Sequence, residues 1–234
     1  MSDSVDDMSK KGSVFPLVIA LFGVVSILLL GGYRVAMASD ARMAFTVAIV
    51  VSLYALWILS ELRITKAEVH KDTHTDRGTC ESYAIARGLT MIAALAFEPL
   101  WVGSGPWLWI GGVLFLAGIA LRGYAIRTLG KNYSHRVRLP SEKHGNDEKN
   151  GEHVYDIVST GPYRLLRHPA YSGMLLAHVG ILIIFFNWFV LAMLSAVFAP
   201  ALIRRIRVEE AHLLSLPGYR AFAEGRARLV PGIW

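Results

Sequence analysis

Charge is the first thing that this sequence lacks. Of its 234 residues only 18% are charged, whereas 54% are hydrophobic, and the mean hydropathy is +0.43. An ordinary soluble domain carries about 25% charged residues. Several apolar stretches approach or reach the roughly 20 residues that a helix needs to cross a bilayer. The composition therefore argues against a multi-domain soluble chain and predicts an integral membrane protein with one compact bundle.

Cysteine is nearly absent as well. The single Cys80 excludes an intramolecular disulfide framework. A cleavage site is also missing: no small-residue motif stands out after the first apolar run, which follows the polar stretch Met1–Lys11. We therefore expect that run to be a retained anchor and not a cleaved signal peptide.

Lys and Arg are nearly absent between Gly88 and Leu121 and between Arg167 and Arg204, although the net charge is +6. A nucleic-acid footprint would need these cations on an exposed folded face. They lie instead in the polar connections and the C-terminal tail, as membrane topology requires. Nucleic acid is therefore excluded as the expected partner, and membrane lipids are expected around the chain.

Six apolar segments alternate with polar connections. They are Val14–Gly32, Met43–Leu59, Tyr83–Val102, Trp107–Ile126, Tyr171–Phe186 and Trp188–Ile203. The last two could form one kinked helix, but together they exceed the length of one crossing, which favours a tight helical hairpin. Pro200 is expected to kink or end the second helix of that hairpin. The predicted fold is an all-α, polytopic transmembrane bundle.

The basic residues also predict an orientation. They crowd into the connections after the second and fourth segments and into the tail, whereas the opposite side has only Arg34 and Arg42. The positive-inside rule then places both termini, the long fourth connection and the tail in the cytoplasm. We expect a single domain, residues 1–234, in which residues 1–82 supply N-terminal helices and a cytoplasmic loop. Residues 121–234 form the half that carries the candidate motifs.

The densest polar motif is Thr160–Gly173, which leads directly into an apolar segment. Two Arg, a His and two Tyr are costly so close to hydrocarbon. They can donate hydrogen bonds to an anionic ligand, while the glycines and prolines constrain the backbone. An interfacial belt would explain the Tyr and Arg residues, but it explains His168 and the glycines less well. A ligand site is favoured.

Three further stretches remain open to more than one interpretation. Arg204–Glu210 is either a helix exit with ion pairs such as Arg205–Glu209 or an acidic group facing a cationic ligand. Gly130–Val137, taken alone, is typical of a basic loop at lipid headgroups. His70 and His74 could share a helix face for a metal, but the turn-rich sequence favours a hydrated loop, and we predict no metal.

These motifs together resemble the isoprenylcysteine carboxyl methyltransferase family, integral membrane enzymes that use S-adenosylmethionine. The matching strings are Gly130–Val137, Val158–Tyr163 and Arg167–Gly173, then Glu209-Glu210 followed by Leu214, Gly218 and Tyr219. The Arg-His-Pro-x-Tyr-x-Gly string with a Glu pair after a helical hairpin is fairly specific. It recurs loosely in phospholipid methyltransferases, and a related architecture occurs in sterol reductases that use NADPH. The resemblance covers Leu121 to the end and leaves the first two segments unmatched.

The resemblance implies a cytoplasmic cofactor pocket closed by the fourth connection and the tail, with a tunnel that delivers a lipophilic or prenylated substrate from the bilayer. The residues implied to bind S-adenosylmethionine are Tyr163, His168, Pro169, Tyr171, Gly173 and Glu209. The residues implied to carry the reaction are Arg205, Arg167, Glu210 and His135. The polar insertion Ser141–Gly151, which departs from the family pattern, is expected to loosen or regulate the lid.

Methyl transfer from a sulfonium is an in-line displacement that depends mainly on alignment. A carboxylate acceptor is already ionised and needs a cation, Arg205 or Arg167, in a dry site. An amine or hydroxyl acceptor needs a base, which His135, His168 or Glu210 would supply. The resemblance, with which these residue types agree, therefore implies a membrane methyltransferase acting on a lipophilic acceptor such as a prenylcysteine-type carboxylate.

Three alternatives remain. A phospholipid N-methyltransferase should tolerate the loss of Arg205, and a reductase should bind NADPH. A transporter or scaffold would need charges lining a path near the bilayer midplane. Only Glu98, Arg87 and Arg122 fall in the predicted spans. Both arginines lie near predicted helix ends, where they are expected to reach the interface, so a transport path is not favoured.

Overall fold

The computed structural model describes residues 15–68, 78–100, 105–130, 133 and 157–234. Within these ranges the regular structure is helical, and the one isolated bridge joins Leu166 to Ala227. The elements, in chain order, are α2 (Phe15–Ala36), α3 (Ala41–Glu68), α4 (Thr79–Ala96), α5 (Pro106–Leu129), the 3₁₀ turn η2 (Gly161–Arg164), α7 (Pro169–Ile184), α8 (Trp188–Ala192), the π-helical segment η3 (Met193–Phe198), α9 (Ala199–Leu213) and α10 (Tyr219–Ala223). The predicted all-α class is confirmed for the described part of the chain.

Four helices are long and apolar enough to cross a membrane: Val18–Ala36, Ala41–Glu61, Pro106–Leu129 and Trp188–Leu213. Helix α7 is apolar but shorter, with 16 residues. Helix α4 ends at Ala96 and not at Val102, since Pro99 interrupts the apolar run. The protein is therefore a helical membrane protein with four helices of full spanning length in its described part.

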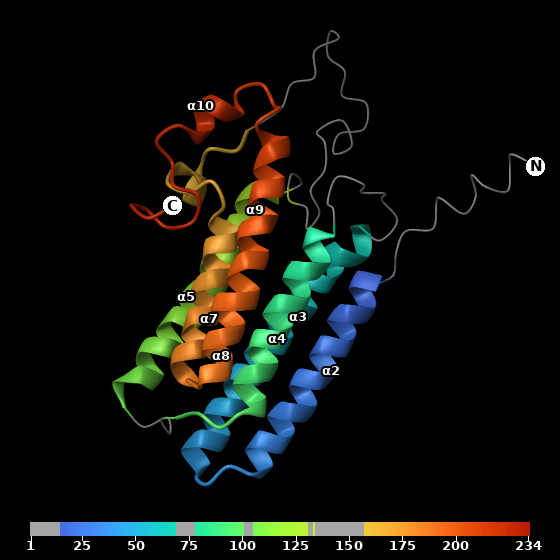
Figure 1. Cartoon of the computed structure of the whole chain (residues 1–234), viewed down its shortest axis with the longest axis vertical. Helices are drawn as coiled ribbons and strands as arrows, with labels where there is room; N and C mark the ends of the chain where they lie inside the picture. The colour runs from blue at the N-terminus through green and yellow to red at the C-terminus, as the bar shows by residue number, and fades with distance from the viewer. Residues whose placement is uncertain (1–14, 69–77, 101–104, 131–132, 134–156) are drawn as a thin grey trace, which may run out of the picture.

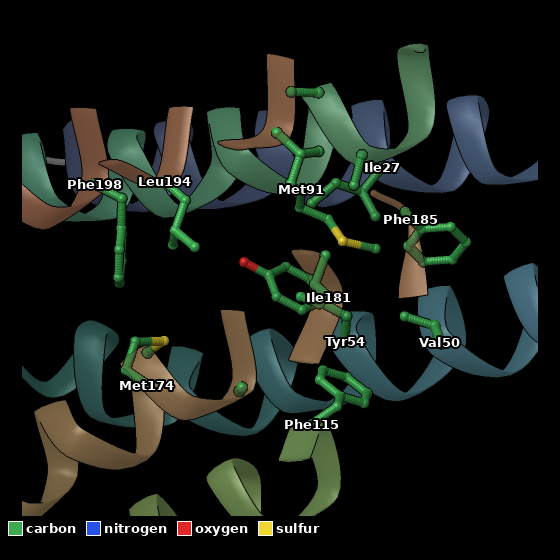
Figure 2. Packing of buried hydrophobic residues seen from close by; sticks show 14 of the residues in the cluster. Ile27, Val50, Tyr54, Met91, Phe115, Met174, Ile181, Phe185, Leu194 and Phe198 are labelled. Atoms are coloured by element: carbon green, nitrogen blue, oxygen red, sulfur yellow. The ribbon is translucent and has the colours of Figure 1, made fainter. Parts of the chain in front are cut away.

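The long helices run nearly side by side, and their buried faces form one apolar core (Figure 1). Ile27 of α2, Tyr54 of α3, Met91 of α4 and Ile181 of α7 are all at most 1% exposed and meet in this core (Figure 2). The opposite helix faces expose many large apolar side chains, such as Trp109 at 77%. Exposed apolar side chains in such number fit helices surrounded by lipid.

Helices α5 and α7 form the most extensive helix pair. Their backbones meet at four glycines: Gly111, Gly118, Gly173 and Gly180. A Cβ placed on Gly173 would lie 2.6 Å from the backbone N of Arg122 and 2.6 Å from the carbonyl oxygen of Gly118. Small residues permit such close approach of helices in membranes. The absent side chain of Gly173 is thus used for helix packing, while contact of this residue with a cofactor stays a prediction.

The expected helical hairpin is present. Helix α7 ends at Ile184, and α8 begins at Trp188. Asn187 is the N-cap of α8, and its side-chain oxygen accepts a hydrogen bond from the Val190 amide at 2.9 Å. Of the two effects expected of Pro200, a kink or an end of the helix, the end does not occur. The segments α8, η3 and α9 follow one another without interruption to Leu213. Pro200 is the second residue of α9, directly after the π-helical segment η3 and Ala199, where a missing backbone donor is tolerated.

The described parts of the motifs lie at one end of the bundle. Figure 1 shows α10, the C-terminus and the last turn of α9 at the end where α7 begins and α5 finishes. Polar residues from distant parts of the sequence therefore meet there.

Candidate functional site

The C-terminal tail is fastened along the start of α7. The amide of Arg167 donates to the carbonyl of Ala227 at 2.8 Å, and the amide of His168 donates to the carbonyl of Arg228 at 3.1 Å. The Ser172 hydroxyl donates to the carbonyl of Leu229 at 2.7 Å. Pro169, at the first position of α7, has no amide to satisfy, so the helix can begin there directly against the tail.

Glu210, near the end of α9, joins these two segments by its side chain. Its Oε1 lies 3.3 Å from Nε2 of His168 and 3.3 Å from Nη1 of Arg167, and its Oε2 accepts from Nε of Arg228 at 2.6 Å. The Glu210 side chain is only 6% exposed. A carboxylate surrounded by three donors is held as an anion. The geometry therefore favours Glu210 as a positioning group, not as the general base considered for an amine or hydroxyl acceptor.

A second cluster lies beside the first on α4, α7 and α9. Nε of Arg205 donates to the hydroxyl oxygen of Tyr171 at 2.9 Å, and that hydroxyl donates to Oε2 of Glu209 at 2.7 Å. Nη1 of Arg205 donates to Oγ1 of Thr79 at 2.8 Å. Arg205 is 1% exposed. This geometry holds a guanidinium inside the bundle, as a site for a carboxylate requires.

A third cluster was not anticipated from the sequence. Glu61 of α3 accepts from Nε and Nη2 of Arg122 at 2.5 and 3.0 Å, and from Nη1 of Arg87 at 3.2 Å. Nε1 of Trp57 donates to the same carboxylate at 2.8 Å. Arg87 and Arg122 therefore do not reach the interface as expected; they are buried against a carboxylate.

Arg122 connects this third cluster to the motifs. Its Nη1 donates to the carbonyl of Ala170, in the first turn of α7, at 3.3 Å, and its Nη2 donates to the Tyr133 hydroxyl at 3.1 Å. Glu61 lies two residues beyond the predicted end of its apolar segment, and so it was counted in a polar loop. The signal that could have found it is the presence of two arginines in predicted spans, which need a buried carboxylate.

Tyr163 is buried in a small cluster with Ala170, Tyr219 and Phe222 at this end of the bundle. Its hydroxyl faces the carbonyl of Ala125 at 3.5 Å. Burial raises the pKa of both Tyr163 and Tyr219, so both hydroxyls stay protonated and can donate. Tyr163 thus packs against Ala170, in the first turn of α7, and against Tyr219 and Phe222 of α10.

Two buried hydroxyls, those of Tyr83 and Tyr219, have no hydrogen-bond partner among the residues that the structure describes. Buried polar groups are nearly always paired, and an unpaired one calls for an explanation such as an absent ligand. Tyr219 lies within the electrostatic influence of Glu209, Glu210, Arg167 and Arg228. The Tyr219 hydroxyl therefore belongs with the cluster around Glu210, whereas the Tyr83 hydroxyl belongs with the cluster around Arg205.

Of the other predicted site residues, His135 lies outside the described residues, as do the His70 and His74 pair and the insertion Ser141–Gly151. Among the described residues no group of three His, Cys, Asp or Glu side chains is arranged to hold a metal ion.

Comparison with known proteins agrees with the motif positions. Residues 109–215 match the isoprenylcysteine carboxyl methyltransferase family. The chain is 29% identical over 154 residues to protein-S-isoprenylcysteine O-methyltransferase A of Arabidopsis thaliana, a match that covers 64% of this chain and 73% of that protein. It is 33% identical over 109 residues to protein-S-isoprenylcysteine O-methyltransferase of Tribolium castaneum, covering 47% of this chain and 35% of the relative. No solved structure matches the chain.

Proposed function

We propose that this chain is a member of the isoprenylcysteine carboxyl methyltransferase family, which its residues 109–215 match. We further propose that it methylates the carboxyl group of a prenylated cysteine in the membrane and takes the methyl group from S-adenosylmethionine. The family match over residues 109–215 and the similarity to the Arabidopsis enzyme agree with the resemblance identified in the sequence. The matched region contains α5, α7 and α9, the helices on which the candidate site is built.

The observation that carries the proposal is the convergence of the matched motifs on two adjacent charged clusters. Glu210 joins the Arg-His-Pro string to the tail, and Arg205 is held by Tyr171 and Thr79 one helical turn away. One cluster is suited to holding a methyl donor, and the other presents a buried cation to an anionic acceptor. A methyl transfer between two bound molecules needs both.

For the methyl donor, the residues that fit are His168, Tyr171, Glu209 and Tyr219. Glu209 can accept from an amino group or a ribose hydroxyl, and the unpartnered Tyr219 hydroxyl can donate. When bound, S-adenosylmethionine supplies a methyl group on a positively charged sulfur. The backbone contacts between residues 166–168 and 227–228 keep these groups together.

For the acceptor, Arg205 is better placed than Arg167. The side chains of both arginines have protein partners, but those of Arg167 are the carboxylate of Glu210 and the carbonyl of Arg226, whereas Arg205 is bound by the hydroxyls of Tyr171 and Thr79 and is only 1% exposed. A carboxylate oxygen forms the new bond to the methyl carbon as the carbon–sulfur bond breaks, and no proton has to move. Arg205 therefore acts by positioning the carboxylate, and no side chain has to act as a base.

The orientation in the membrane is part of the proposal. Six crossings, with α4 and α7 as the shorter ones, would bring both termini and the site to the cytoplasmic face. The Lys and Arg residues of the connections and tail support this orientation. The prenyl group of the substrate would then enter laterally from the bilayer, while its carboxylate reaches Arg205.

The test uses the protein purified in detergent. We expect micromolar binding of S-adenosylmethionine by calorimetry, lost in His168→Ala, and transfer of a labelled methyl group to a farnesylated N-acetylcysteine as a base-labile ester. Phosphatidylethanolamine and NADPH are the matched comparisons. Methylation of the phospholipid, or binding of NADPH without binding of S-adenosylmethionine, would overturn the proposal.

A further inference from the structure

Tyr83 of α4 is a buried side chain whose polar atom is unused. It is 7% exposed, and within the described part of the chain its hydroxyl has no hydrogen-bond partner. Burying a hydroxyl without a partner costs free energy that phenylalanine would not incur at the same position. The retained hydroxyl therefore needs a reason other than packing.

Its surroundings are aromatic on two sides. The Tyr83 ring makes an edge contact with Tyr171, with 5.7 Å between ring centroids and planes at 76°. It lies against Phe198 at 5.7 Å and 33°. These contacts hold the ring in one position, so the direction of the hydroxyl is fixed by packing that needs no hydrogen bond.

Tyr83 also lies next to the Arg205 cluster. Thr79, which accepts from Arg205, is four residues earlier on α4 and so shares a face of that helix with Tyr83. Tyr171, which contacts the Tyr83 ring, accepts from the same guanidinium. Two neighbours of Tyr83 thus bind Arg205 directly.

The charges that act on the Tyr83 hydroxyl favour an anion. Three nearby guanidinium groups, those of Arg122, Arg87 and Arg205, outnumber the two nearby carboxylates, Glu61 and Glu209. A negatively charged oxygen would be attracted by this field, and the hydroxyl could donate to it at the same time.

We propose that the Tyr83 hydroxyl donates a hydrogen bond to a carboxylate oxygen of a substrate bound beside Arg205, and that this bond sets the position of the carboxylate. The inference rests on the proposed function. Two carboxylates take part in the reaction, that of the acceptor and that of the methionine moiety of the methyl donor, and the same chemistry recognises either.

The decisive variant is Tyr83→Phe, which removes only the unpartnered oxygen. We expect a melting temperature equal to or above that of the unchanged protein, together with a rise of about tenfold in the KM for the farnesylated acceptor or in the Kd for S-adenosylmethionine. The first result assigns the acceptor's carboxylate and the second assigns the donor's. A structural role alone would leave both constants unchanged, and that outcome overturns the inference.

The matched control is Tyr54→Phe. The Tyr54 hydroxyl is also buried, but it lies 3.1 Å from Nε2 of His178 and donates to the carbonyl of Arg87 at 3.4 Å. Its removal should lower the melting temperature and leave the two constants unchanged. Equal responses of the two variants would count against a special role for Tyr83.

A second readout depends on charge. The carboxamide of the farnesylated acceptor is tested as a competitive inhibitor, since it lacks the negative charge. If the acceptor's carboxylate is the partner, Tyr83→Phe should reduce the preference for carboxylate over carboxamide. Turnover that is absent in the unchanged protein would overturn the proposed function and this inference together, whereas normal turnover with unchanged constants in Tyr83→Phe overturns this inference alone.

Discussion

Two buried glutamates, each bound by two arginines, organise different parts of this molecule. Glu61 joins α3, α4 and α5 through Arg87 and Arg122, and the side chains of this cluster are 2–13% exposed. Glu210 joins α9 to the start of α7 and to the tail through Arg167 and Arg228, whose side chains are 21% and 37% exposed. The first cluster is deep in the bundle, and the second is partly open to solvent.

The two clusters differ in how much of their side-chain surface is exposed, and this difference suggests different roles. A deeply buried ion group contributes mainly by avoiding unpaired charges, because removing one partner leaves the others without compensation. A partly exposed cluster can rearrange and exchange partners with water or a ligand at smaller cost. We therefore expect Glu61 to govern the stability of the bundle and Glu210 to govern binding at its end.

The largest effect is expected for Glu61→Ala. It leaves two buried guanidinium groups without their shared carboxylate, and it should lower the free energy of unfolding by about 3–5 kcal/mol. This loss is measured by chemical denaturation of the protein in a mild detergent, with tryptophan fluorescence as the signal of unfolding. A change below about 1 kcal/mol would contradict the assignment of Glu61 as the centre of the deep cluster.

Glu210→Gln should have a smaller effect on stability and a larger one on the tail. It weakens charge-assisted hydrogen bonds worth about 1.5–3 kcal/mol each at full strength. We expect weaker S-adenosylmethionine binding and faster tryptic cleavage near Arg226 and Arg228. Glu61→Gln serves as the control. Equally fast cleavage of the tail in that variant would contradict the prediction that Glu210, and not Glu61, holds the tail.

Gly173→Ala tests the link between the two regions. Its new methyl group would press on the backbone of Arg122, from 2.6 Å away, and so disturb the partner of Glu61 from the motif side. Overpacking of this kind costs about 1–3 kcal/mol. Gly112→Ala in α5, where a Cβ has no atom within 4 Å, is the matched control and should be neutral or slightly stabilising. Equal stability of the two variants in thermal unfolding would refute the close α5–α7 contact.

The smallest effect is expected for Glu98→Ala. Glu98 accepts from Nη1 of Arg34 at 3.4 Å, but its side chain is 89% exposed. Such a pair contributes less than about 1 kcal/mol. Thermal unfolding should therefore be nearly unchanged, and a shift as large as that of Glu61→Ala would show that depth is not the deciding variable.

Much of the fold could be predicted from the sequence because long apolar runs specify helices in a membrane. The hairpin around Asn187 followed from segment lengths, and it is present. The predicted apolar segment ends at Leu59, but helix α3 continues to Glu68. The residues after Leu59 are more polar, yet most of them favour a helix. Hydropathy describes where lipid can surround a helix, not where the helix ends.

The site was predictable where its residues belong to contiguous motifs. Arg167, His168 and Glu210 were all identified, and the structure brings them together. Glu61 could not be found by motif, because its arginine partners are 26 and 61 residues away in sequence. The unused hydroxyl of Tyr83 is a property of packing, and no sequence pattern signals it.

The π-helical segment Met193–Phe198 carries one further consequence. A π turn holds one residue more than the α-helical turn that it replaces, so it shifts the rotational phase of everything that follows. Each residue of an α-helix turns the chain by about 100°. Deletion of one residue from this segment would therefore turn α9, and with it Arg205 and Glu210, by about 100° relative to the bundle, without removing a single charged group. The orientation of the candidate site's residues on α9 is thus set by a local irregularity about two turns before Arg205.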